Sequence, residues 1–246
     1  MDDYEGCERV VVKTGNVINN NDILKRPGKT AADELWEGLR SAASAGIRQR
    51  NGDEMIIKCP EKVYADDVDF NDLLTTVKIF VNDDSQDLLK EAIKKCLSYL
   101  ETSRLGILVV AFQPGSPQTL ESLKTLWSIL QASVDDGTVQ LIGLSDVDTE
   151  MFIELYNWAR VKPSIVQISL TGCCLVPPQL KDFTKLHDIQ LLTHSDPHEM
   201  LPQDKLDEIL PGFPVKQLYV AKFQAHIKCR GVLATKGYLL CAHKGN

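Results

Sequence analysis

The sequence lacks the features that mark secreted and membrane proteins. Its 246 residues contain no apolar run long enough to cross a bilayer. The first residues, MDDYEGCERVVVKTGN, are acidic and have neither the basic start nor the apolar stretch of a signal peptide. We therefore expect a cytoplasmic protein.

Positive charge is also scarce. There are 27 Lys and Arg against 34 Asp and Glu, a net charge of −7, and no long basic run. This balance argues against nucleic acid or an anionic membrane as a partner and favours a protein or a small molecule. With 43% hydrophobic and 25% charged residues, the composition is that of a soluble globular protein of one large domain or two small ones.

The cysteines show no CxxC spacing and are odd in number, which argues against a disulfide framework and a zinc ribbon. The seven stand at positions 7, 59, 96, 173, 174, 229 and 241. His187, His194 and His198 lie near Cys173 and Cys174 in sequence, but the proline in HSDPH prevents an H-E-x-x-H helix. We expect loop histidines and buried thiols there, and no metal.

Glycine-rich phosphate loops are missing as well. Neither G-x-G-x-x-G nor G-x-x-x-x-G-K-[ST] occurs, and GLSDVD lacks the second glycine of a nucleophile elbow. We interpret GLSDVD as a strand that ends in a Ser/Asp turn, and we expect no cofactor.

What the sequence does contain is a regular alternation of strand-like and helix-like segments. Apolar runs typical of strands stand at 73–81, 105–112, 139–144, 164–170 and 188–193. The segments between them are long enough for helical crossovers, so the strands should be parallel with helices outside. The pattern predicts an α/β fold and leaves open a (β/α)8 TIM barrel or an open doubly wound sheet.

Helix boundaries can be predicted at several points. Ser116, followed by Pro117, is a candidate N-cap for a helix that ends at Gly137. Asp148 should cap the next helix, which should stop before Pro163.

The two ends of the chain do not follow the alternation. Residues 1–30 read as an N-terminal extension or loop, and residues 195–217 as a long loop with room for one helical turn. Residues 225–242 predict a terminal strand and hairpin, with a turn at Gly231 followed either by a further strand or by a hairpin that pivots at TKGY, residues 235–238. We treat residues 1–246 as a single domain with these modified ends.

Lys78 stands inside the first strand of the alternation, in TTVKIF. Strand periodicity places it on the same face as Thr76 and Phe80, with Val77 and Ile79 on the other. A buried ammonium is costly unless it is paired. We therefore expect a carboxylate or a carbonyl in the interior to satisfy it.

Residues 73–200 resemble the aldo-keto reductase family. The resemblance is carried by LIGLSDVDTEMFIELYNWARVKPSIVQISLTGCC, by GILVVAFQP at the family's H-x-P strand, and by the lysine of TTVKIF. It implies a TIM barrel. In that family a Tyr is the general acid, Lys and Asp tune its pKa, and a His orients the carbonyl.

The chain departs from this tetrad. Lys78 matches the lysine, but Phe112 stands near the histidine position, and no D-[TS]-A-x-x-Y-G segment precedes Lys78. Without the phenol there is no proton donor for a reduced carbonyl. Lys78 is then a vestige of the tetrad. Lys228 and Arg230 are the only residues that resemble the family's phosphate-binding segment. We assign no catalytic and no cofactor-binding residue.

A more specific resemblance runs through most of the chain in order. TGNVINN, GLSDVD, LYNWARVKPSIVQISL, CCLVPPQL, DIQLLTHSDPHEML and RGVLATKGYLLCA are similar to the family of regulatory (modifier) subunits of glutamate–cysteine ligase. That family is a catalytically silent relative of the aldo-keto reductases. The resemblance implies a heterodimer with the glutamate–cysteine ligase catalytic subunit, better use of glutamate and relief of feedback inhibition by glutathione.

Two further possibilities follow from these resemblances. Cys173 or Cys174 could form a redox-dependent intersubunit bond, although one core-facing thiol and one small turn residue is the favoured interpretation. The competing function is an NADP(H)-dependent carbonyl reductase with a rearranged site, supported by Lys78 and Lys228 alone.

Overall fold

The computed structural model describes residues 4–19, 28, 30–60, 62–64, 69, 72–169 and 176–245. Its internal contacts divide the chain into two compact units, one of residues 1–74 and 197–246 and the other of residues 75–196. We call them unit 1 and unit 2. The expectation of a single domain over 1–246 stays a prediction.

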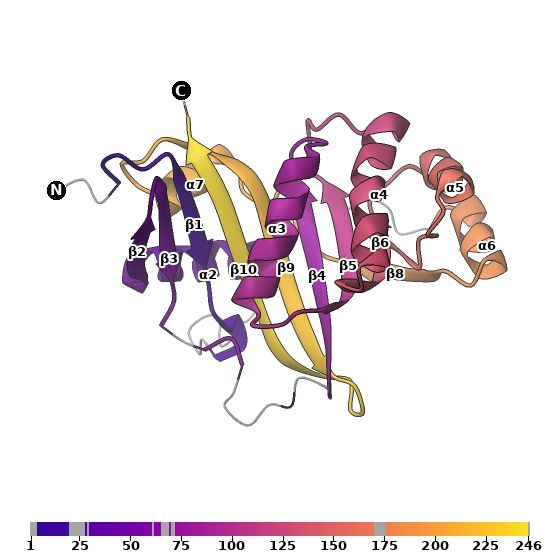
Figure 1. The fold of residues 1–246 in the computed structure, drawn as a ribbon, viewed down its shortest axis with the longest axis horizontal. Helices are drawn as coiled ribbons and strands as arrows, with labels where there is room; N and C mark the ends of the chain where they lie inside the picture. The colour runs from indigo at the N-terminus through magenta and orange to yellow at the C-terminus, as the bar shows by residue number, and fades with distance from the viewer. Residues whose placement is uncertain are drawn as a thin grey trace. The chain divides into compact units, whose positions relative to one another are not determined.

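Unit 2 is the regular β/α part of the chain (Figure 1). Its elements are β4 (Leu73–Val81, from Thr75 on), α3 (Gln86–Tyr99), β5 (Leu105–Phe112), α4 (Leu120–Asp135), β6 (Val139–Ser145), α5 (Thr149–Trp158), β7 (Ile165–Ser169), α6 (Pro178–Leu186) and β8 (Gln190–His194). The five predicted strands are confirmed, and all their pairings are parallel.

The strand order chooses between the two architectures that the sequence left open. The strands of unit 2 follow one another as β4-β5-β6-β7-β8. Helices that follow one another in sequence also touch, α3 on α4, α4 on α5 and α5 on α6. A doubly wound sheet reverses its strand order at a switch point, whereas a barrel does not. The α/β class and its aldo-keto reductase-like, barrel-type order are confirmed.

The core of unit 2 is filled by the continuous apolar strands. Leu108, Val109 and Val110 of β5 are fully buried. Trp127 of α4 is also buried, and its indole N–H donates to the Val161 carbonyl at 2.9 Å. Gly143 is required where β6 meets β7, because a Cβ there would lie 2.5 Å from the Ile165 carbonyl oxygen.

Of the two helix N-caps predicted from the sequence, one is confirmed and one is wrong. Asp148 caps α5 as expected, since its carboxylate accepts from the backbone N–H groups of Glu150 and Met151. Ser116 was the wrong cap for α4. Thr119 is the N-cap and accepts from the Ser122 N–H, while the Ser116 hydroxyl donates to the Val81 carbonyl at 3.2 Å.

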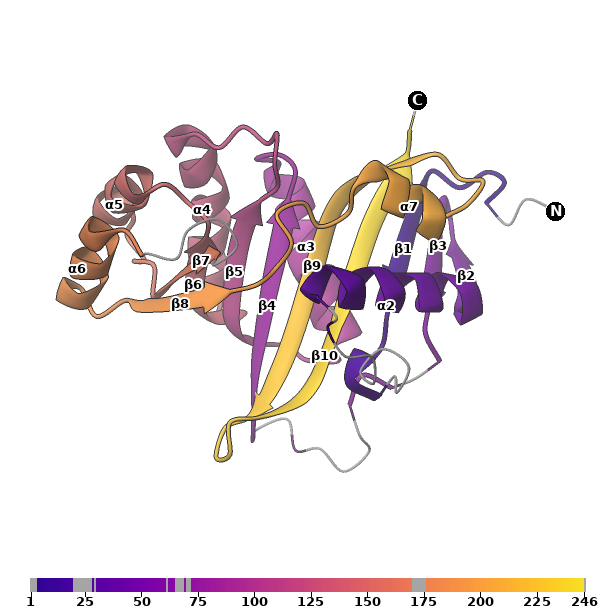
Figure 2. The same ribbon diagram turned by 180° about the vertical axis from the view of Figure 1, so that it is seen from behind.

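Unit 1 has a different, mostly antiparallel sheet (Figure 2). Its elements are β1 (Arg9–Lys13), the 3-10 turn η1 (Val17–Asn19), α2 (Ala31–Ala45), β2 (Ile47–Asn51), β3 (Glu54–Lys58), α7 (Gln203–Ile209), β9 (Val215–Ile227) and β10 (Val232–Lys244). The strand order is β2-β3-β1-β10-β9, and only β1 and β3 are parallel. The expected modification of both chain ends is thus confirmed.

The structure corrects three predictions at these ends. Residues 1–30 are not all loop, because residues 9–13 form β1 with Val10, Val11 and Val12 in the core. The segment 195–217 contains α7 and the start of β9. The short apolar VVV run and the Pro-rich composition hid these elements.

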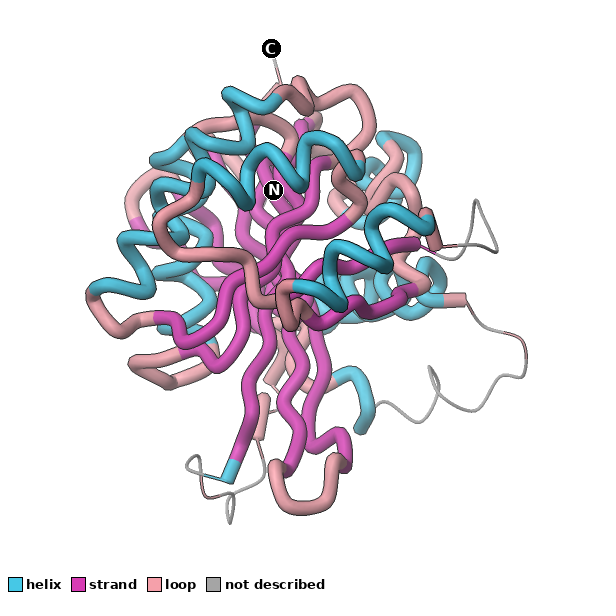
Figure 3. Tube along the Cα trace, turned by 90° about the vertical axis from the view of Figure 1, so that its right-hand side faces the viewer, coloured by secondary structure: helices cyan, strands magenta, loops and turns pink. Residues whose placement is uncertain are grey.

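The tail forms one long hairpin of β9 and β10, with Gly231 at its turn at a φ of +62° (Figure 3). Of the two alternatives after Gly231, the further strand is confirmed and the hairpin pivot at 235–238 is wrong, since these residues lie inside β10. Gly237 is there for close packing: a Cβ would lie 2.3 Å from the Gly15 carbonyl oxygen.

Polar contacts hold helix α2 against the rest of unit 1. Thr30 and Asp33 form a reciprocal capping box at its start. The Tyr238 hydroxyl donates to the Glu34 carboxylate at 2.7 Å, and Lys236 binds the same carboxylate at 2.6 Å. None of the helices in the described ranges is long and apolar enough to cross a membrane.

The corrected cap gives a stability test. We expect Thr119→Ala to lower the free energy of unfolding by about 1 kcal/mol, because the Ser122 N–H loses its acceptor. Ser128→Ala in the same helix is the control, and we expect its effect to stay within about 0.5 kcal/mol. Urea unfolding measures both, and equal effects of the two substitutions would contradict the assigned cap.

Candidate functional site

A cluster of polar side chains lies toward the carboxyl ends of the parallel strands of unit 2. Lys78 comes from β4, Ser145 from the last position of β6, and His194 from the last position of β8. Asp146 follows β6 directly, and Asp196 lies two residues beyond the end of β8. Parallel strands present their carboxyl ends at one edge, which is where α/β folds place functional groups.

Lys78 is the centre of this cluster. Its ammonium donates to the Asp196 carboxylate at 2.8 Å and to the Ser145 hydroxyl at 2.8 Å. Lys78 is only 4% exposed and Asp196 3%, so the ion pair is buried. The ammonium also lies 5.0 Å from the centre of the Phe80 ring, on the face that strand periodicity predicted. The expected interior carboxylate is therefore Asp196.

The Lys78–Asp196 contact shows how strongly the parallel sheet curves. Strands β4 and β8 are the two ends of the five-strand order. Four spacings of about 4.8 Å would separate them by about 19 Å in a flat sheet. A lysine on β4 reaches a carboxylate two residues beyond β8 only because the sheet bends around the cluster, as in a barrel wall.

Asp146 and His194 form the outer half of the cluster. The His194 Nε2 lies 2.8 Å from the Asp146 carboxylate and 3.1 Å from the Ser145 hydroxyl. The other carboxylate oxygen of Asp146 accepts from the Ser169 N–H at 2.8 Å. Asp146 adopts a φ of +57°, an uncommon conformation outside glycine that Asp tolerates better than most residues. Its backbone thus turns so that the carboxylate meets His194.

The contacts between the two outer groups shift both of their pKa values. Burial by itself would raise the pKa of Asp146, but the hydrogen bond and positive charge of His194, with Ser145 and Lys78, hold the pKa below its usual value. Burial by itself would lower the pKa of His194, but the hydrogen bonds to Asp146 and Asp196 raise it above its usual value, against the repulsion of Lys78. The Asp196 N–H donates to the His194 Nδ1 at 3.2 Å, so in this arrangement Nδ1 accepts and Nε2 carries the proton that meets Asp146.

The cluster has the connectivity of a Ser-His-Asp triad but not its chemistry. His194 touches Ser145 through Nε2 and Asp196 through Nδ1, at 3.1 and 3.2 Å. A nucleophile must be reachable and must donate its hydroxyl proton to the base. Ser145 is 0% exposed, and its hydroxyl donates to Asp146 while it accepts from Lys78. We infer that the network positions backbone and side chains and does not attack a substrate.

The other residues singled out in the sequence are not brought into this cluster. Phe112, at the end of β5, is half-buried and pairs in register with Val81. The His187 ring is tilted against the Phe183 ring with their centres 4.4 Å apart, and His198 is exposed. Lys228 and Arg230 are exposed at the β9–β10 turn of unit 1.

Cys173 and Cys174 lie outside the described residues, so their predicted placement is not tested.

Sequence reasoning named Lys78 but missed its partners. Ser145 and Asp146 stand in GLSD and His194 and Asp196 in HSD, each at the carboxyl end of a predicted strand. Because such ends converge in a parallel sheet, the two segments carried a usable signal.

The buried ion pair makes a strong stability prediction. We expect Lys78→Met to lower the free energy of unfolding by about 3–5 kcal/mol, because Asp196 is left as a buried charge without its lysine. The double variant Lys78→Met with Asp196→Asn should regain at least half of that loss.

Lys124→Met, which removes a surface pair with Glu121, is the matched control and should cost less than about 1 kcal/mol. A Lys78→Met loss no larger than that of Lys124→Met in urea unfolding would show that the pair is not buried as described.

The shifted pKa values predict a pH dependence. A raised pKa of His194 gives stability that is complete below the unfolded value of about 6.5 and is lost as pH rises through the folded value. The lowered pKa of Asp146 gives stability that is complete above about 3.8 and is lost as pH falls through the folded value.

We therefore expect the urea midpoint to fall as pH rises from about 6.5, and His194→Gln to flatten this fall. His198→Gln, on an exposed histidine, should leave the wild-type profile unchanged. An unaltered slope in His194→Gln would remove His194 as its source.

Comparison with known proteins agrees with this description. The aldo/keto reductase family, as a sequence profile, matches residues 58–203. The glutamate–cysteine ligase regulatory subunit of Homo sapiens is 30% identical over 254 aligned positions, which cover 95% of this chain and 92% of that protein. The putative regulatory subunit of Schizosaccharomyces pombe is 25% identical over 50% of the chain and 45% of its own length.

Solved structures are more distant. A crystal structure of an aldo-keto reductase enzyme from a deep-sea metagenome library is 20% identical, with a TM-score of 0.41 over 47% of this chain and 41% of that one. The family assignment therefore rests on the sequence: the profile match spans more than half of the chain, and the human relative is aligned across both units. This chain belongs to the aldo/keto reductase family, together with the regulatory subunits of glutamate–cysteine ligase.

Proposed function

We propose that this chain is a non-catalytic regulatory subunit that binds the catalytic subunit of glutamate–cysteine ligase as a heterodimer. The observation that carries the proposal is the 30% identity to the human regulatory subunit across 95% of the chain. An alignment of that extent includes the modified sheet of unit 1 as well as the β/α repeats. We further propose that the protein acts in the cytoplasm.

The state of Lys78 supports a non-catalytic role. In the aldo-keto reductases that the chain resembles, this lysine tunes the pKa of a tyrosine that protonates the carbonyl. Here the ammonium donates to Asp196 and Ser145, with Phe80 beside it. The tyrosine segment that such a lysine would act on is missing from the sequence, and this absence supports a structural role for the buried Lys78–Asp196 pair.

Regulation then works through an equilibrium of the ligase. A partner shifts an equilibrium between two conformations only if it binds one of them more tightly. We propose that this chain binds the ligase conformation that uses glutamate well and resists feedback inhibition by glutathione. A coupling of about 1–3 kcal/mol, or about 5- to 150-fold in affinity, is ordinary for such an effect.

The contact with the ligase remains a prediction. We propose that it involves residues 197–217 and 231–242, which lie outside the parallel repeats of unit 2. A redox-dependent bond through Cys173 or Cys174 is a further prediction. It fails if replacing both residues by Ser leaves complex formation unchanged under oxidising conditions.

The proposal is tested by mixing the purified chain with the ligase catalytic subunit. We expect the two to co-elute by size, and the complex to need less glutamate and to tolerate more glutathione than the catalytic subunit alone. A heated sample of the chain is the control for non-specific effects.

Failure to co-elute, with no change in the glutamate requirement, would reject the regulatory role. If the chain instead binds NADPH and turns over a generic aldehyde, the competing function as a carbonyl reductase replaces it.

A further inference from the structure

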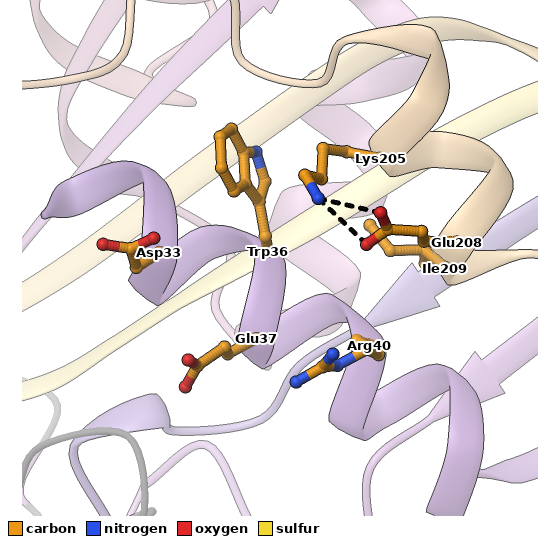
Figure 4. Close-up of a pocket in the computed structure, with 7 residues that line it drawn as sticks. All are labelled: Asp33, Trp36, Glu37, Arg40, Lys205, Glu208 and Ile209. Atoms are coloured by element: carbon orange, nitrogen blue, oxygen red, sulfur yellow. Dashed lines mark hydrogen bonds and ion pairs between the residues drawn. The ribbon is translucent and has the colours of Figure 1, made fainter. Parts of the chain in front are cut away.

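A surface pocket lies between α2 and α7 in unit 1 and holds about 200 Å³ (Figure 4). Both helices lie on the same side of the unit 1 sheet and contact each other (Figure 2). Its polar lining consists of Asp33, Trp36, Glu37 and Arg40 from α2, and of Lys205 and Glu208 from α7. Residues 197–217, proposed above as part of the ligase contact, supply the α7 side of this pocket.

Two acidic groups of the pocket are already bound within the chain. The Asp33 carboxylate accepts from the N–H and hydroxyl of Thr30 at 2.9 and 2.8 Å, as part of the α2 capping box. The Glu208 carboxylate accepts from the Lys205 ammonium with both oxygens, at 2.8 and 3.0 Å. Glu37 also has an interaction within the chain. The carboxylates therefore do not leave the pocket an open site for a cation.

Arg40 is different. It is exposed, and within the described part of the chain its guanidinium has neither a hydrogen bond nor an ion pair. The hydrogen bond to Glu208 raises the pKa of Lys205, and the positive charge of Arg40 acts in the opposite direction, so the two cations are close enough to influence each other. A guanidinium offers five planar N–H donors that match a carboxylate.

Trp36 gives the pocket a fixed apolar wall. Its indole N–H donates to the Met200 carbonyl at 2.9 Å, and the Lys205 ammonium lies 5.5 Å from the centre of its ring. The ring is therefore held in place before any ligand arrives. Trp and Arg are the residue types most often found at the energetic centre of protein interfaces.

We propose that Arg40, beside the wall of Trp36, binds an aspartate or glutamate side chain of a protein partner. The volume favours a protein side chain over a free carboxylate, because small-molecule sites are typically about 300–1,000 Å³ and enclose most of their ligand. The chain as a whole carries a net charge of −7, which does not attract an acidic partner. The attraction between Arg40 and the partner's carboxylate must therefore act at short range, within the screening length of about 8–10 Å.

The inference rests on the proposed function for its partner, which is the catalytic subunit of glutamate–cysteine ligase. The test is the dissociation constant of that complex at physiological salt. We expect Arg40→Gln to weaken binding about 10-fold, the size of one lost charge-assisted contact, and Arg40→Glu to weaken it further. Arg104→Gln, on an exposed arginine of unit 2, is the matched control and should stay within about twofold.

A second variant changes binding in the opposite direction. Glu208→Gln removes a negative charge next to Lys205 and should strengthen binding severalfold, a result that damage to the fold would not produce. Thermal unfolding checks that Arg40→Gln stays folded, as expected for an exposed side chain.

The outcomes separate the two proposals. If the wild-type chain does not bind the catalytic subunit, the regulatory role is rejected. If wild type binds and the Arg40 variants bind equally well, or no worse than Arg104→Gln, the pocket is not the contact. If the Arg40 variants weaken binding at low salt but not at physiological salt, the effect reflects only long-range attraction, and this also overturns the inference.

Discussion

The ion pair between Lys78 and Asp196 is the interaction on which the arrangement of unit 2 depends. It joins the first strand of the parallel order to the segment that follows the last. Burying both charges is costly, and the cost is offset only while the two groups stay together with their hydrogen bonds. The pair therefore favours the curved sheet over flatter alternatives, because in a flat sheet each charge would be buried without its partner.

The same network explains how a buried lysine is satisfied in a scaffold of the reductase type. Ser145, Asp146 and His194 surround the pair and occupy the edge of the sheet where parallel α/β proteins place their chemistry. In this network Lys78 donates to Asp196 and Ser145 and so links the two ends of the parallel strand order.

Unit 1 replaces regular β/α repeats with a mostly antiparallel sheet, covered on one side by α2 and α7. The pocket between these helices combines a fixed indole with a guanidinium that has neither a hydrogen bond nor an ion pair within the described residues. Because the indole is already held in place, it loses little conformational entropy on binding a partner.

The sequence by itself determined the local features: the five parallel strands, the Asp148 cap, the face of Lys78 and the family. These follow from periodicity and from contacts between near neighbours in the chain. Only the tertiary structure decided the partner of Lys78, which is 118 residues away, the role of His194, and the strand order that favours a barrel. It also showed that Gly237 serves close packing inside a strand, where the sequence suggested a turn. Distant pairings depend on how the strands curve, and no local pattern encodes that curvature.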